Sequence, residues 1–157
     1  MGGRSEEALD VAARAKAGYR HSFDMLGESA RTTPDALKYL ASYKNAVAAV
    51  SAATERGTNV FMAQSVSVKL SALHPRYEFV KRERMYAELY PRMLELAQAA
   101  KAGGIGLTVD AEEADRLELS LDLFERLAGE ASLAGWNGLG LAVQAYQKRA
   151  LSARMAR

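Results

Sequence analysis

Three short segments in which apolar residues alternate with small ones constrain the fold more than any other feature of this sequence. They read VSVKL, GLTVD and GLAVQ, and alternation of this kind predicts β-strands with one buried face. The residues expected on the buried faces are Val66, Val68 and Leu70, then Ile105, Leu107 and Val109, then Leu139, Leu141 and Val143. A fourth strand is expected in HSFDMLGE, followed by a turn at Gly27.

Helical segments lie between these strands. The expected helices run from about Glu6 to Ala17, from Thr33 to Gly57, from Val80 to Ala102, from Glu112 to Ala128, and over the basic C-terminus. The second helix has the clearest signals, since Thr33 is placed to cap it, Pro34 suits a first helical position and Gly57 closes it. Strands and helices that alternate in this way predict parallel strands joined by right-handed crossovers.

The third of these segments carries a helical stripe and also a proline. Its apolar stripe consists of Met85, Leu89, Met93, Leu96 and Ala100. Pro91 predicts either a kink or two helical pieces that meet, although the small Ala87 four residues earlier lessens the steric clash.

Two architectures fit this order of elements: an open doubly wound sheet or a closed (βα) barrel. A doubly wound nucleotide-binding fold usually has a glycine-rich turn directly after its first strand, and this chain has none. The GGIG segment at Gly103 to Gly106 comes before a strand, where it is expected to end a helix.

Each strand is expected to end in one long polar residue on the face opposite the apolar one. These residues are Lys69, Asp110 and Gln144, with small residues before them; Asp24 ends the first strand and Glu28 follows in its loop. In a (βα) barrel, inward-facing residues at the carboxyl ends of the strands build the active site. The alternatives are ordinary solvent-facing strand ends and a structural ion pair between Lys69 and a carboxylate. Acidic residues in the AEEADR segment are expected in a first helical turn, where they favour the helix dipole.

Composition narrows the class of protein further. The 157 residues are 49% hydrophobic and 25% charged, as in a soluble globular domain. No segment has the pattern of a membrane span or of a secretory signal, so we expect a cytoplasmic location. The absence of cysteine excludes thiolate chemistry, and His21 with His74 makes a poor zinc site, so no metal is expected. A net charge of +2 gives no case for nucleic-acid binding.

Four longer motifs resemble the proline dehydrogenase domain found in bacterial proline utilization A proteins. They are FDMLGE, SVKLSALHPRYE, LTVDAEEADRLELSLDLFE and GWNGLGLAVQAYQKR. The resemblance implies an α/β fold in which parallel (βα) units form about four strands of a distorted (βα)8 TIM-type barrel. It also implies FAD as cofactor, oxidation of L-proline to Δ1-pyrroline-5-carboxylate, a quinone as electron acceptor, and membrane association that is at most peripheral.

The same resemblance implies roles for individual residues. Lys69 would contact the substrate carboxylate, while Asp110 with Ala111 beside it would line the flavin and proline site. Gln144 would hydrogen bond to the flavin ring. Asp24 and Glu28 would lie over the substrate, with Glu28 as an ion-pair partner that helps to close the site.

We expect one partial barrel domain over residues 1–157. It comprises a leading helix in 1–20, four βα units in 21–144, and a basic C-terminal helix with a divergent tail in 145–157. A (βα)8 barrel needs about 250 residues, so this segment is expected to be inactive alone. The alternative is a non-catalytic half-barrel that acts by self-association, as a homo-oligomer, or by binding an intact homologue.

Overall fold

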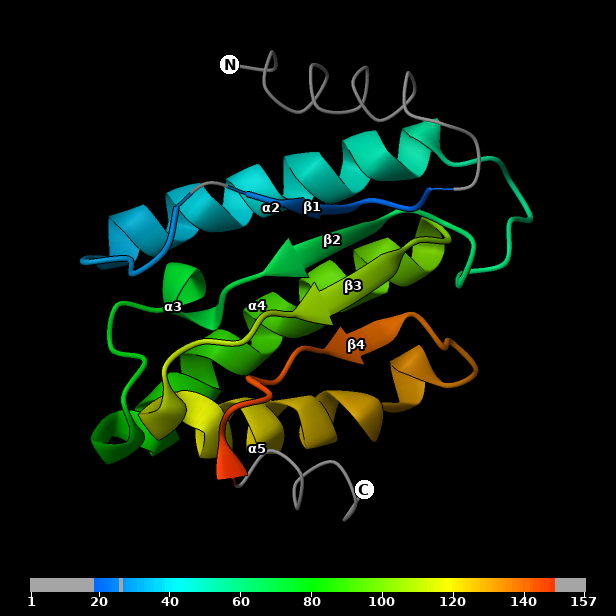
Figure 1. Ribbon diagram of the computed structural model, residues 1–157. Coiled ribbons are helices and arrows are strands. Elements are labelled where there is room, and N and C mark those ends of the chain that lie inside the picture. Colours follow the sequence, from blue (N-terminus) through cyan, green and yellow to red (C-terminus); the bar gives the residue numbers. More distant parts are fainter. Residues whose placement is uncertain (1–18, 26, 149–157) are drawn as a thin grey trace.

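A parallel four-stranded sheet with helices packed on one face forms the described part of the chain. The computed structural model describes residues 19–25 and 27–148. The strands are β1 (Ser22–Asp24), β2 (Ser65–Val68), β3 (Gly106–Val109) and β4 (Leu139–Leu141). They lie side by side in the order β1-β2-β3-β4, and every neighbouring pair is parallel (Figure 1).

This strand order decides between the two architectures predicted from the sequence. A doubly wound sheet reverses its strand order at a switch point, whereas here every crossover steps in the same direction. Right-handed crossovers in one direction leave the long helices on the same face of the sheet, as in a (βα) barrel. The sheet is open, because β1 pairs only with β2 and β4 only with β3 among the described residues.

The cap of helix α2 (Thr33–Ala53) lies one residue earlier than predicted. The cap is Thr32 and not Thr33: its hydroxyl accepts from the Asp35 backbone N–H, and the Asp35 carboxylate accepts from the Thr32 N–H in return. This reciprocal capping box fixes the start of the helix. The helix ends at Ala53, before Gly57, which has a positive φ of 82° in the turn that follows.

Helix α4 (Arg82–Ala102) is continuous through Pro91. It starts two residues after the predicted Val80, because Phe79–Lys81 forms the 3-10 turn η1. The predicted stripe is confirmed, since Met85, Leu89, Met93, Leu96 and Ala100 are all fully buried. Pro91 and Ala87 lie on the exposed side of the helix.

The strand–helix boundaries at the end of β2 and after β3 also differ from the prediction. β2 ends at Val68, and Leu70–Leu73 forms the short helix α3. After β3, the chain passes through the 3-10 turn η2 (Ala114–Arg116) before α5 (Leu117–Ala128) begins. Helix α5 therefore starts later than the predicted Glu112, and η3 (Ala131–Leu133) leads from it toward β4.

In β2 and β3 the two faces differ as their alternation predicts, whereas Leu139, Leu141 and Val143 are only half-buried and β4 ends three residues before Gln144. Val66, Val68, Leu107 and Val109 are fully buried against the helices. The opposite face carries the half-buried residues Ser65, Ser67 and Thr108. This second face leads toward the polar residues at the carboxyl ends of the strands.

Two predicted elements fall largely or wholly outside the described residues. They are the leading helix at Glu6 to Ala17 and the basic C-terminal helix. Within residues 19–25 and 27–148, no helix combines the length and the apolar character that a membrane span needs.

His74, directly after α3, couples the stability of the fold to pH. Its Nδ1 accepts from the Arg76 N–H at 3.1 Å, and its Nε2 lies 3.3 Å from Glu88 Oε2 without the alignment of a hydrogen bond. Burial lowers the pKa of His74 below its ordinary value. The folded state thus binds fewer protons than the unfolded state, so the free energy of unfolding falls as the pH drops below about 6.5.

We expect urea denaturation to give a lower free energy of unfolding at pH 5.5 than at pH 7.5. The loss is at most about 1.4 kcal/mol per pH unit for one group. His74→Gln should remove most of this difference. Equal pH dependence in wild type and His74→Gln would assign the effect to other groups.

Candidate active site

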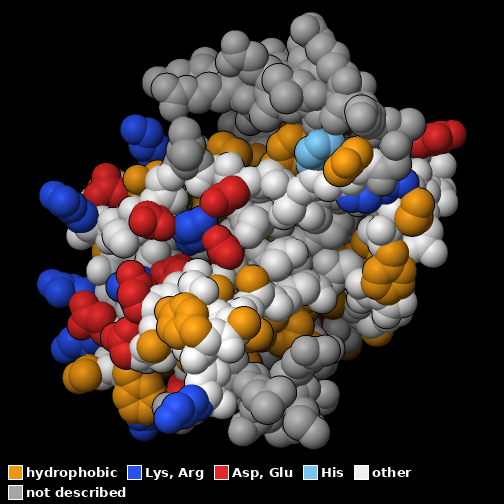
Figure 2. Space-filling view, in the orientation of Figure 1, with side chains coloured by type: hydrophobic (Ala, Val, Ile, Leu, Met, Phe, Trp, Pro, Cys, Tyr) orange, Lys and Arg blue, Asp and Glu red, His pale blue; other side chains and the backbone are white. Residues whose placement is uncertain are grey.

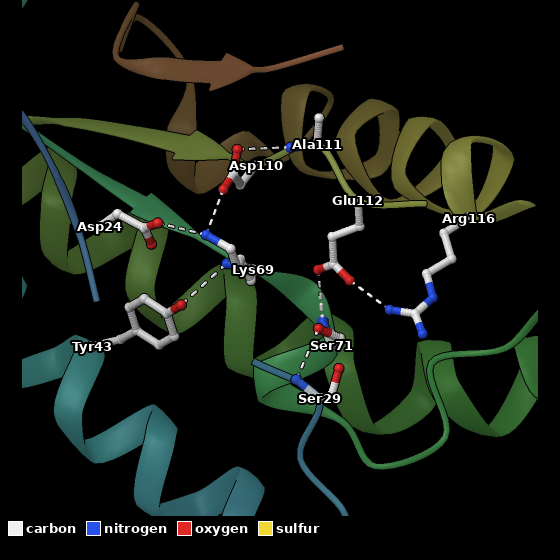
Figure 3. Close-up of polar contacts among 9 residues, drawn as sticks. All are labelled: Asp24, Ser29, Tyr43, Lys69, Ser71, Asp110, Ala111, Glu112 and Arg116. Carbon is white, nitrogen blue, oxygen red and sulfur yellow. Dashed lines mark hydrogen bonds and ion pairs between the residues drawn. The ribbon is translucent and has the colours of Figure 1, made fainter. Parts of the chain in front are cut away.

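A lysine held between two carboxylates lies at the carboxyl ends of three neighbouring strands. Lys69 Nζ is 2.6 Å from Asp24 Oδ2 and 2.7 Å from Asp110 Oδ2 (Figure 3). Asp24 ends β1, Lys69 directly follows β2, and Asp110 directly follows β3. The parallel register of the sheet brings the three side chains together, as the sequence predicts.

The Lys69 ammonium stays charged at neutral pH. Partial burial lowers its pKa, but hydrogen bonds and charge attraction from Asp110 and Asp24 more than offset this, and the net pKa lies above the ordinary lysine value. The side chain is 17% exposed. Lys69 is therefore a fixed cation that remains accessible from one side.

The backbone at Lys69 is anchored by a buried tyrosine of α2. The Lys69 N–H donates to Tyr43 Oη at 3.2 Å, and Tyr43 is almost completely buried. Burial raises the pKa of Tyr43 to about 12, which keeps its hydroxyl neutral. This contact joins residues far apart in sequence, so strand and helix periodicity gave no signal for it.

Asp110 is held by its own backbone surroundings as well as by Lys69. Its Oδ1 accepts from the Ala111 N–H at 2.9 Å, and its backbone N–H donates to Val68 O at 2.9 Å. Both carboxylate oxygens thus have partners, which fixes the direction of the group.

A second polar cluster lies next to the first and was not predicted. Ser71 N–H donates to Glu112 Oε1 at 2.9 Å, while Arg116 Nη1 donates to Glu112 Oε2 at 2.7 Å (Figure 3). Glu112 was expected in a first helical turn, where it would favour the helix dipole. It lies before η2, and its side chain is only 6% exposed. The spacing of Glu112 and Arg116, four residues apart, was the available sequence signal for their ion pair.

Gln144 and Glu28 are not joined to the lysine cluster by contacts among the described residues. Gln144 is half-buried in a small pocket that Ala111 and Ala142 also line. Its side-chain amide has no hydrogen-bond partner within the described part of the chain. Glu28 is exposed in the loop after β1, and no described side chain pairs with it.

Charged side chains gather at the end of the molecule to which the strands point. Figure 2 shows red and blue side chains on the left of this face, while its middle is mostly white. In Figure 1 the arrowheads of the strands point toward this same side. The ionic cluster thus occupies the carboxyl-end rim of the sheet, the position of active sites in (βα) barrels.

Curated relatives and a family match agree with this geometry. Residues 8–155 match the family described as proline dehydrogenase. The chain is 52% identical over 132 residues to the bifunctional protein PutA of Salmonella typhimurium, and 47% identical over 147 residues to that of Rhizobium meliloti. These matches cover 84% and 91% of the chain but only 10% and 12% of the relatives.

Solved structures of relatives share the architecture. A Bradyrhizobium japonicum proline utilization A variant is 50% identical with a TM-score of 0.83, covering 95% of this chain and 15% of that one. A second structure, with proline bound in remote sites, is 48% identical with a TM-score of 0.83 over 96% of this chain and 15% of that one. The open sheet therefore corresponds to part of the barrel in those proteins, and this chain belongs to the proline dehydrogenase family.

Proposed function

We propose that this chain forms one side of the active site of an FAD-dependent proline dehydrogenase. The reaction is the oxidation of L-proline to Δ1-pyrroline-5-carboxylate, with a quinone as the final electron acceptor. The observation that carries this proposal is the Lys69 ammonium, fixed between Asp24 and Asp110 at the carboxyl-end rim of the sheet. Membership of the family supports the choice of substrate.

Lys69 has one donor left for a substrate carboxylate. An ammonium group carries three N–H donors, and two of them are directed at Asp24 and Asp110. Among the described residues the ammonium has no third partner. Its remaining N–H and its partial exposure suit a charge-assisted hydrogen bond to the carboxylate of proline.

The two aspartates make the site selective for a zwitterion. Lys69, Asp24 and Asp110 together carry a net charge of −1 when all three are ionised, which disfavours a simple anion. Proline brings a positive nitrogen as well as a carboxylate, so the nitrogen can face an aspartate while the carboxylate binds Lys69. Two opposite contacts fix the orientation of the ring, and such orientation lowers the barrier to reaction.

The residues around Gln144 suit a flavin ring. Its amide offers both a donor and an acceptor and has no partner within the described residues, and the small side chains of Ala111 and Ala142 line the same small pocket. We propose that Gln144 and Ala111 hold the flavin beside Asp110. FAD, when bound, accepts the hydride that leaves proline.

Gln144→Leu should weaken FAD binding about twofold to tenfold, the usual range for one net hydrogen bond. The measurement is a flavin titration by fluorescence in a full-length PutA relative that carries this segment. Gln98→Leu, on the exposed side of α4, serves as the matched control and should leave binding unchanged. Unchanged FAD affinity in the Gln144 variant would remove this residue from the flavin site.

The proposed activity is tested by loading that full-length relative with FAD and following Δ1-pyrroline-5-carboxylate formation from L-proline with a quinone acceptor. We expect turnover there and none from residues 1–157 alone, because the described strands form an open sheet. For the chain alone, titrated FAD should leave the flavin absorbance and fluorescence unchanged. Absence of proline oxidation in the full-length relative would contradict the proposal.

The open sheet also favours a second function, a non-catalytic half-barrel that self-associates or binds an intact homologue. β1 and β4 each present an unpaired edge within the described part of the chain, and such edges pair readily with other strands. This function predicts a dimer at micromolar concentration by analytical ultracentrifugation. A compact monomer under those conditions would contradict self-association.

A further inference from the structure

The loop that carries Glu28 has an unusual backbone on both sides of that residue. Gly27 has a φ of +123° and Ser29 has a φ of +56°, a conformation rare for residues with a side chain. Gly27 also lies against the Tyr39 ring, where an added Cβ would approach Cε1 to 2.2 Å. Surrounding contacts must hold such a backbone in place.

Ser71, in the short helix α3 that follows β2, supplies contacts that hold this backbone. The Ser29 N–H donates to Ser71 Oγ at 3.1 Å, and the Ala30 N–H donates to Ser71 O at 2.9 Å. Ser71 is 4% exposed, so water does not readily replace either acceptor. One residue of α3 therefore binds two successive amides directly after Glu28.

Glu112 in turn holds Ser71. Its Oε1 accepts from the Ser71 N–H, and its Oε2 is paired with Arg116, so both oxygens have partners. A nearly buried carboxylate with two such partners is costly to move. The chain of contacts from Arg116 through Glu112 and Ser71 reaches the loop after β1 (Figure 3).

We infer that Ser71, held by Glu112, is a positioning residue that fixes the loop so that Glu28 is presented at the Lys69 rim. The inference rests on the proposed function, in which Glu28 helps to close the proline site. In this role Ser71 acts through the backbone of residues 29 and 30. The loop and the end of β3 are thereby coupled, although no strand pairing joins them directly.

Amide exchange in the 157-residue chain tests the positioning contact independently of activity. Ser71→Ala removes the acceptor of the Ser29 N–H and should speed exchange of that amide about twofold to tenfold. Ser120→Ala is the matched control, because Ser120 is as buried and also hydrogen bonded, to Tyr77. Unchanged Ser29 exchange in Ser71→Ala would overturn the inference.

Glu112→Gln provides a second variant if Ser71→Ala fails to fold. It keeps an oxygen for the Ser71 N–H but loses the charge that pairs with Arg116. We expect faster exchange at Ser71 and Ser29, with the Lys69 amide unchanged because Tyr43 holds it. Uniformly faster exchange across all of these amides would indicate general destabilisation and would contradict a specific positioning role.

A double-mutant cycle in the full-length relative links the contact to substrate. Ser71→Ala should raise the KM for proline about twofold to tenfold with little change in flavin content, and should have no further effect once Glu28→Ala is present. Additive effects of the two substitutions would show that Ser71 does not act through Glu28. If Glu28→Ala alone leaves the KM for proline unchanged, the role of Glu28 in the proposed function is contradicted. The Ser29 amide-exchange rates then still test whether Ser71 holds the loop.

Discussion

Replacing Lys69 with methionine raises the KM for proline about 10- to 150-fold in a full-length relative that carries this segment. Hydrogen bonds to charged groups contribute about 1.5–3 kcal/mol, and each 1.4 kcal/mol is a factor of ten. Methionine keeps an unbranched side chain one atom shorter than that of lysine but has no N–H for a carboxylate. Flavin content should change little, because in the proposed site Gln144 and Ala111 hold the cofactor.

The control for this prediction is Lys38→Met, which removes an exposed lysine of α2 that has no contact with the lysine cluster among the described residues. Steady-state kinetics and flavin absorbance on the same preparations give both readouts. Because Lys69→Met also leaves Asp24 and Asp110 without their shared cation, thermal unfolding of the variant should be measured alongside. A loss of flavin as large as the loss in proline affinity would make Lys69 a structural residue.

Leu107→Ala destabilises the described fold by about 2–5 kcal/mol, the second large effect that we expect. Leu107 is fully buried in β3, which pairs with both β2 and β4. Truncating such a residue loses apolar burial and leaves a cavity. Urea denaturation of the 157-residue chain, followed by circular dichroism, measures the change.

Leu37→Ala is the matched substitution on the surface. Leu37 is 51% exposed on α2, so its replacement should change the free energy of unfolding by less than about 0.5 kcal/mol. Equal effects at the two leucines, or no cooperative transition in the wild-type chain, would contradict a packed core around β3.

The parts of the fold that were predictable from sequence depend on short-range periodicity. Alternation in β2 and β3 identified their buried faces, and spacing along α4 identified its buried stripe. Boundaries were less accurate because they depend on local contacts that periodicity does not report. Thr32 and not Thr33 caps α2 because Asp35 can return the hydrogen bond.

The residues of the site likewise fall into those that strand order predicts and those that depend on contacts between distant parts of the sequence. Lys69, Asp24 and Asp110 were predicted because parallel strands deliver their carboxyl ends to one rim. Tyr43 and Ser71 were missed because each acts through a hydrogen bond to a residue at least 26 positions away. The roles in binding substrate and flavin stay predictions for every residue of the proposed site, and neither Glu28 nor Gln144 contacts the lysine cluster among the described residues.

Comparing L-proline with L-prolinamide tests the central claim most directly. Inhibition or dissociation constants for both compounds would be measured in the full-length relative, with and without Lys69→Met. If Lys69 binds the substrate carboxylate, the substitution weakens binding of L-proline about tenfold or more and changes that of the amide less than about twofold. Equal weakening for the two compounds would contradict the account.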